Sequence, residues 1–245
     1  METIEIYLNS KNASQMRGDT SDCYFDLPMI TTMTDETAYV SVKSGTIPYS
    51  WYNVNSSNNL LLFTINEVEY SLTITPGNYN VNTLALELQS LFALGGFTFT
   101  VTYVSKTNRF DFKYIGDFVF KKESTCFEIL GLSIQDHYSL VTLGKRILQS
   151  TNGVNLFTVR QLLICSDNFI LGNIDSSNSG NRNIISSVAV TGNPDSMISF
   201  SNTSQHKIHH TKNLTSLHIQ IRTDDGALLQ LNRCHWSITL AINIV

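Results

Sequence analysis

Charged residues are scarce in this sequence. They make up 15% of its 245 residues, whereas an average soluble domain has about 25%. The formal net charge is −4, and no long run of like charges stands out. A protein that coats nucleic acid needs clustered lysine and arginine, so direct nucleic-acid binding is not expected. Asparagine, serine and threonine supply the polar groups instead, and a surface of this kind is easily desolvated in a broad protein contact.

Secretory signals and long apolar runs are also missing. The first ten residues, METIEIYLNS, alternate like a strand and have no basic segment followed by an apolar one. No apolar run reaches the roughly 18 residues that a membrane helix needs. The cysteines form no C-x-x-C pair; they are Cys23, Cys126, Cys165 and Cys234. We therefore expect buried free thiols and no membrane span.

The common catalytic motifs are absent as well. The sequence has no G-x-S-x-G, P-loop, G-x-G-x-x-G or H-E-x-x-H motif. Its one metal-like group is QHKIHH, residues 205–210. On a strand, His206 and His210 would share a face while His209 points away, and no glutamate follows downstream to complete a cupin-like set. We expect a solvated loop here. We expect no enzymatic activity, no metal site and no cofactor.

Most of the sequence alternates between apolar and polar residues, which is typical of half-buried antiparallel strands. The clearest hairpin signal is Asp224-Asp225-Gly226, between the expected strands at residues 214–223 and 227–232. The strand at residues 37–51 contains Gly45, which we interpret as a bulge or bend. Many short strands with long polar connections predict a sandwich, and the jelly roll suits this length. The other main alternating segments are residues 3–10, 23–28, 155–169, 184–190, 196–202, 214–223 and 235–245.

A segment in the first half of the chain follows a different pattern. Residues 60–75 read as a hairpin with its turn at Asn66 and Glu67, and residues 81–96 form the one convincing amphipathic helix. Short strands are expected after the helix, at residues 97–105, 110–115 and 118–122.

The helix carries its own start and stop signals. Asn82 or Thr83 can cap its N-terminus, and two glycines from Gly95 end it. The sequence therefore predicts an all-β fold, a single jelly-roll sandwich of residues 1–59 and 134–245. An inserted β-β-α-β-β unit occupies residues 60–133.

The stretch SGTIPYSWYNV, residues 44–54, ends one strand with a proline and three aromatic residues. Pro48 has no N–H to donate, so it marks an edge or the point where the strand leaves the sheet. Alternation places Tyr49 and Trp51 on the side that suits a core. Three residues beyond the strand are then left as candidates for contacts between subunits: Tyr52, Asn53 and Asn55.

Several motifs, taken in order, resemble the minor capsid, or penton, proteins of polinton-like viruses, virophages and related large DNA viruses of protists. The most specific is IPYSWYN within VSVKSGTIPYSWYNVNSSNN, residues 40–59. The others are LNS-x-NA (8–13), Y-x-L-T-I-x-P-G-N-Y (70–79), ILGL (129–132) and DDG-x-L-L-Q-L-N-x-x-x-W-S-I-T-L (224–240).

The resemblance implies a single jelly roll that assembles as a homopentamer at the icosahedral vertices of a virion. The neighbouring major capsid protein would be its partner there, and a vertex fibre or host receptor is a further candidate partner. It also implies synthesis in the host cytoplasm or a virus factory, with no catalytic residues and no cofactor.

Two other functions remain open at this point. A related minor capsid protein that cements capsomers on the facets would have the same fold class. A carbohydrate-binding jelly roll would use Tyr49, Trp51 and Tyr52 as a platform on which sugar rings stack.

Overall fold

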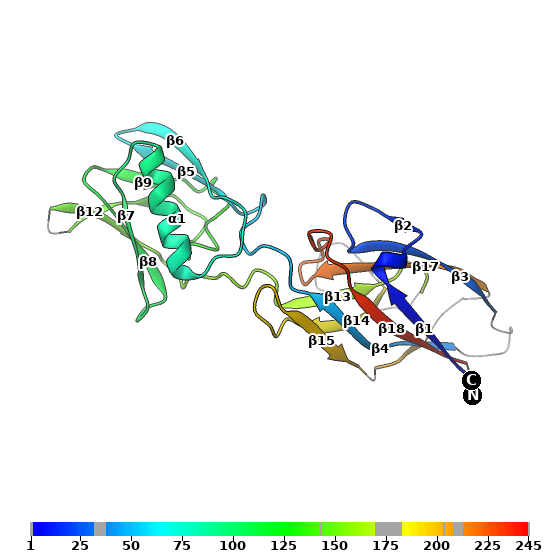
Figure 1. The fold of residues 1–245 in the computed structure, drawn as a ribbon. Coiled ribbons are helices and arrows are strands. Elements are labelled where there is room, and N and C mark those ends of the chain that lie inside the picture. The colour runs from blue at the N-terminus through cyan, green and yellow to red at the C-terminus, as the bar shows by residue number, and fades with distance from the viewer. Residues whose placement is uncertain are drawn as a thin grey trace. The chain divides into compact units, whose positions relative to one another are not determined.

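The computed structural model describes residues 2–31, 38–142, 144–169, 183–202, 204–207 and 213–244. The chain divides into two compact units (Figure 1). We call Met1–Trp51 together with Val159–Val245 the sandwich unit, and Tyr52–Thr158 the inserted unit. Each unit has its own hydrophobic core.

The sandwich unit consists of two antiparallel sheets. In the described residues, the first sheet has the order β1-β18-β4-β15, with β16 also paired to β4, and the second has the order β14-β13-β17-β3-β2. The strands of the first sheet are β1 (Glu2–Asn9), β18 (Ser237–Ile244), β4 (Ala38–Pro48), β15 (Met197–Ser201) and β16 (His206–Lys207). Those of the second are β14 (Ile184–Ala189), β13 (Gln161–Cys165), β17 (Asn213–Thr223), β3 (Asp22–Thr31) and β2 (Gln15–Met16).

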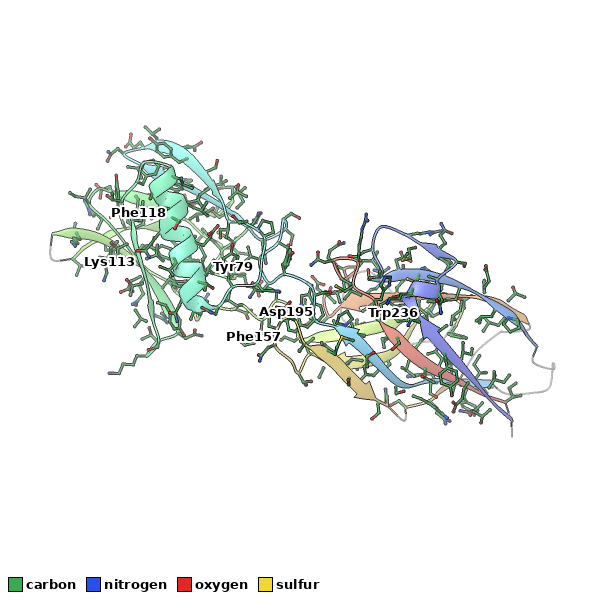
Figure 2. The ribbon with its side chains drawn as sticks, in the orientation of Figure 1. Tyr79, Lys113, Phe118, Phe157, Asp195 and Trp236 are labelled. Carbon is green, nitrogen blue, oxygen red and sulfur yellow. The ribbon has the colours of Figure 1, made fainter. Side chains whose placement is uncertain are left out.

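Alternating side chains build the core between these sheets. On β17, Leu217, Ile219 and Ile221 are fully buried, because residues two apart share one face of a strand. Trp236, the residue just before β18, is buried in this core (Figure 2). Its indole N–H donates to the Thr20 carbonyl at 2.6 Å. The predicted fold class, an all-β jelly-roll sandwich, is confirmed.

The path of β4 differs in detail from the prediction. The register shift against β18 leaves Lys43 as the extra residue, so the bulge is not at Gly45. Gly45 is required for another reason, since a Cβ atom there would lie 2.6 Å from the Phe200 ring and 2.9 Å from the Ser237 carbonyl oxygen. Pro48 is the last residue of the strand, the position that its missing N–H allows.

The inserted unit also consists of two antiparallel sheets, with the helix α1 (Val81–Leu94) packed against β7. In the described residues the orders are β10-β9-β5-β6 and β11-β12-β8-β7. The first sheet contains β5 (Leu60–Ile65), β6 (Val68–Thr73), β9 (Phe118–Phe120) and β10 (His137–Tyr138). The second contains β7 (Thr100–Val104), β8 (Arg109–Tyr114), β11 (Leu140–Thr142) and β12 (Lys145–Gln149). The sandwich unit, for its part, also contains a short 3₁₀ helix, η1 (Ser10–Asn12), between β1 and β2.

Local signals in this unit were predicted well. The β5–β6 hairpin turns at Asn66 and Glu67, which have positive φ angles of 48° and 68°. The helix is present, but its N-cap is Asn80 rather than Asn82 or Thr83. The Asn80 side chain accepts from the backbone N–H groups of both of those residues, and the Thr83 hydroxyl accepts from Asn80 N–H, which makes a capping box.

The division into units differs from the predicted bounds of 1–59, 60–133 and 134–245. β10 pairs with β9, β12 pairs with β8, and β11 pairs with β12, so these three strands belong to the inserted unit. At the other end, Val54 forms a bridge with Gly77. The inserted segment is therefore longer in both directions than its sequence pattern indicated.

Two further strands were predicted too long. Residues 155–169, expected to form one long strand or two with a bend, contain one short strand, β13, Gln161–Cys165. The turn at Asp224 and Asp225 is formed, but residues 227–232 make only one bridge, Arg222 with Leu228, and no second strand. A turn can form without a ladder beyond it, because a strand also needs a hydrogen-bonded partner along its whole length.

Candidate assembly surface

The end of β4 is held in place by the loop that precedes β15. Tyr49 N–H donates to the Ser196 carbonyl at 2.8 Å, and Asp195 N–H donates to the Tyr49 carbonyl at 3.0 Å. The Ser50 hydroxyl donates to the Leu231 carbonyl at 2.6 Å. The backbone of this stretch is thus fixed from two sides before it leaves the sandwich unit.

Tyr49 and Trp51 form part of the core of the sandwich unit. Their rings are stacked, with centroids 4.1 Å apart and an interplanar angle of 17°. Trp51 is 3% exposed, and burial raises the pKa of the Tyr49 hydroxyl. Among the described residues, the buried indole N–H of Trp51 has no hydrogen-bond partner.

This burial excludes the predicted sugar platform. A stacking platform needs aromatic faces that a ligand can reach, and two of its three proposed rings are inside the core. Tyr52 is 41% exposed and would stand alone. A carbohydrate site built on Tyr49, Trp51 and Tyr52 is therefore wrong for this structure.

Asn53 has a structural position in the inserted unit. It is 6% exposed, and its side-chain amide donates to the Tyr79 carbonyl at 2.7 Å while its side-chain oxygen accepts from Tyr79 N–H at 2.9 Å. Asn53 N–H donates to the Asn78 side chain at 3.1 Å. Tyr79, labelled in Figure 2, lies just before α1, so Asn53 fixes the entry to the helix and has little surface left for a second subunit.

Asn55 begins a compact polar turn. Its N–H donates to the Asn58 side chain at 2.7 Å, and its side-chain oxygen accepts from Ser57 N–H at 2.9 Å and from the Ser57 hydroxyl at 2.6 Å. Such side-chain bonds to the neighbouring backbone are typical of Asx turns. The partly exposed Asn55 and the exposed Tyr52 therefore remain the predicted contact residues of this stretch.

The structure reveals a second candidate contact surface, which is apolar and which the sequence analysis did not predict. β11 is an edge strand whose three residues are all exposed, with Leu140 at 70% and Val141 at 63%. Tyr138, on the strand β10 that precedes β11 in the sequence, is also exposed. The segment HYSLVT contains neither proline, lysine, arginine nor an acidic residue, although edge strands usually carry such residues to prevent pairing with other chains. The absence of these residues from HYSLVT was the sequence signal that could have identified this surface.

The predicted metal-like cluster falls mainly outside the described residues. His206 lies in β16, while His209 and His210 are not described. Among the residues that are described, no three side chains of histidine, cysteine, aspartate or glutamate are grouped so that they could hold a metal ion. In the same residues, no helix has the length and apolar character needed to cross a membrane.

The cysteines lie where the sequence predicted, with one exception. Cys23, Cys126 and Cys165 are buried and Cys234 is exposed, and none of the four forms a disulfide. Burial raises the pKa of Cys23 to about 12, with Asp22 and Asp19 adding to the effect. Burial also raises the pKa of Cys126.

No family model matches this chain, and no curated protein matches it. Solved structures do match. A crystal structure of the mavirus penton protein aligns over 100% of this chain and 100% of that chain, with a TM-score of 0.57 and 12% sequence identity. This chain shares the fold of the mavirus penton protein. A cryo-EM structure of the Sputnik virophage at 3.5 Å aligns over 99% of this chain and 98% of that chain, with a TM-score of 0.48 and 10% identity.

The match to the mavirus penton protein spans both units, so the inserted unit is part of the alignment. At 12% identity the likeness is one of fold. The fold of the chain thus agrees with the jelly-roll fold that the resemblance of the motifs implied.

Proposed function

We propose that this chain is a structural protein of a virus particle, a penton-type minor capsid protein that forms pentameric capsomers at icosahedral vertices. The observation that carries the proposal is the full-length match of both units to the mavirus penton protein. A low content of charged residues and a surface of neutral polar groups support it, because such a surface is easily desolvated in broad contacts between subunits.

The partners of this protein are then other copies of itself and a major capsid protein, and its place is the vertex of the virion. The proposal includes no catalytic residue and no cofactor. Tyr52 and Asn55 are the proposed contact residues at the exit of β4, and the exposed residues of β11 provide an apolar contact surface on the inserted unit.

Mass photometry of the purified full-length chain tests self-assembly directly. We expect a population with five times the mass of the chain, or pentamers that form when the major capsid protein is added. A chain that stays monomeric over a wide concentration range, and that is absent from purified particles, would overturn the proposal.

A reconstruction of the particle separates the vertex from the facet. Density for the jelly roll at the fivefold positions supports the penton assignment. Density only on the facets would replace it with the cementing role that the sequence also allowed.

A further inference from the structure

A cleft of about 560 Å³ opens on the inserted unit. Its lining comes from two segments, residues 124–134 and residues 152–155. This volume lies in the range of about 300–1,000 Å³ that small-molecule sites occupy. Neither the jelly-roll core nor the residues at the exit of β4 contribute to it.

The two segments are tied together by the protein itself. Asn152 N–H donates to the Gly131 carbonyl at 2.8 Å, and Ser133 N–H donates to the Thr151 hydroxyl at 3.0 Å. Gly131 has a φ of 68°, and a Cβ atom there would lie 2.5 Å from the Asn152 carbonyl oxygen. The close approach of the two walls therefore depends on glycine at this position, and the cleft is formed without a ligand.

The cleft combines an apolar floor with a polar wall. Phe127 and Leu132 are buried residues of its lining, and Ile134 is an exposed apolar one. On the polar side, the Asn155 amide donates to a Glu128 carboxylate oxygen at 2.9 Å. The Asn155 side-chain oxygen accepts from Phe157 N–H at 3.2 Å, which fixes the orientation of the amide.

This carboxylate–amide pair leaves groups free for a ligand. Within the described residues, one Glu128 carboxylate oxygen and one Asn155 amide N–H have no hydrogen-bond partner. A strong acceptor and a donor side by side suit two hydroxyl groups on adjacent carbons, because one hydroxyl can donate to the carboxylate while the next accepts from the amide. The apolar face of a sugar ring could then rest on Ile134.

The charge of the lining restricts the ligand further. Glu128 is its one ionisable side chain, and lysine, arginine and histidine do not occur among the lining residues. A phosphate, sulfate or sialic acid would meet a carboxylate with no basic group to offset it. From this geometry and charge we propose that the cleft binds a neutral pyranose sugar through vicinal hydroxyl groups, with Glu128 as acceptor and Asn155 as donor.

The site is separate from the proposed function, since pentamer formation is measured by mass and sugar binding by a ligand signal. Either result can fail while the other holds. The site also differs from the excluded platform of Tyr49, Trp51 and Tyr52, which lies at the exit of β4.

The test uses the full-length chain and saturation-transfer NMR. The probes are methyl α-mannopyranoside, lactose and diacetylchitobiose, with sialyllactose as the anionic probe and the tripeptide Gly-Lys-Gly as the cationic one. We expect at least one neutral sugar to bind in the millimolar range. Glu128→Ala and Asn155→Ala should each weaken that binding at least tenfold, and both variants should keep the thermal midpoint within a few degrees.

Glu123→Ala is the matched control, because Glu123 is an exposed neighbour that does not line the cleft. It should bind the sugar as the unmodified chain does. Three results would each overturn the proposal: no neutral sugar binds, binding is unchanged in Glu128→Ala, or only sialyllactose or Gly-Lys-Gly binds. If Asn155→Ala unfolds, Glu128→Ala decides alone, because the Glu128 side chain is exposed.

Discussion

At the exit of β4, neighbouring side chains have opposite surroundings. Tyr49 and Trp51 stack inside the core, whereas Tyr52 is exposed one residue later. β4 ends at Pro48, yet burial keeps the period of two through Trp51, because hydrogen bonds of Tyr49 and Ser50 hold this stretch in place. The burial of Asn53 depends on its two bonds to Tyr79 rather than on alternation.

Substitutions at the two neighbouring aromatic residues should separate folding from assembly. Trp51→Ala removes a fully packed ring, so we expect it to lower the free energy of unfolding by about 3–5 kcal/mol. Tyr52→Ala should change it by less than about 1 kcal/mol and should mainly reduce the pentamer fraction. Denaturant melts and sedimentation velocity measure the two effects. Equal loss of stability in both variants would contradict the division.

Thiol reactivity should also follow burial. The thiolate is the reactive form, and the raised pKa values of Cys23 and Cys126 keep these thiols protonated at pH 8. We expect one fast-reacting thiol per folded chain with Ellman's reagent, that of the exposed Cys234, and four thiols in denaturant. Cys234→Ser should remove the fast phase. A fast phase that persists in this variant would show that a buried thiol is reached by local opening.

At the scale of elements, the β5–β6 hairpin turns where the sequence predicted, although one of its two turn residues is not the most favourable residue type for that position. Asn66 and Glu67 both have positive φ, as a two-residue turn of this hand requires. Asparagine tolerates that conformation, whereas glutamate has no side-chain advantage there. The strands on either side, with Leu61, Phe63 and Leu72 buried, hold the turn in place.

Glu67→Gly should therefore stabilise the protein. Glycine adopts positive φ without steric cost, so we expect a gain of about 1 kcal/mol in the free energy of unfolding. Glu69→Gly is the control: Glu69 is an exposed residue of β6, and glycine within a strand should cost about 0.5–1 kcal/mol. Thermal or denaturant melts compare the two. A loss of stability in Glu67→Gly would mean that the glutamate side chain supports the turn.

At the scale of the whole molecule, the two units have separate cores. The core of the sandwich unit contains Trp51 and Trp236, and that of the inserted unit is rich in phenylalanine, including Phe110 and Phe112. Separate cores favour separate unfolding transitions, because cooperativity depends on shared packing.

We expect differential scanning calorimetry of the full chain to resolve two transitions. Phe110→Ala should lower the midpoint of one transition, and Ile219→Ala should lower that of the other, since these fully buried side chains belong to different cores. A single transition that both substitutions shift equally, with equal calorimetric and van't Hoff enthalpies, would contradict independent unfolding.

The sequence by itself determined the all-β class, the β5–β6 turn, the helix and the core position of alternating residues, because turns, caps and side-chain periodicity depend on neighbours in the chain. Only the tertiary structure decided which sheet each short strand joins. It placed β10 and β12 in the inserted unit, buried Asn53 against Tyr79 and brought Glu128 beside Asn155. Each of these rests on a partner distant in the chain, and the identity of that partner is set by long-range pairing rather than by local composition.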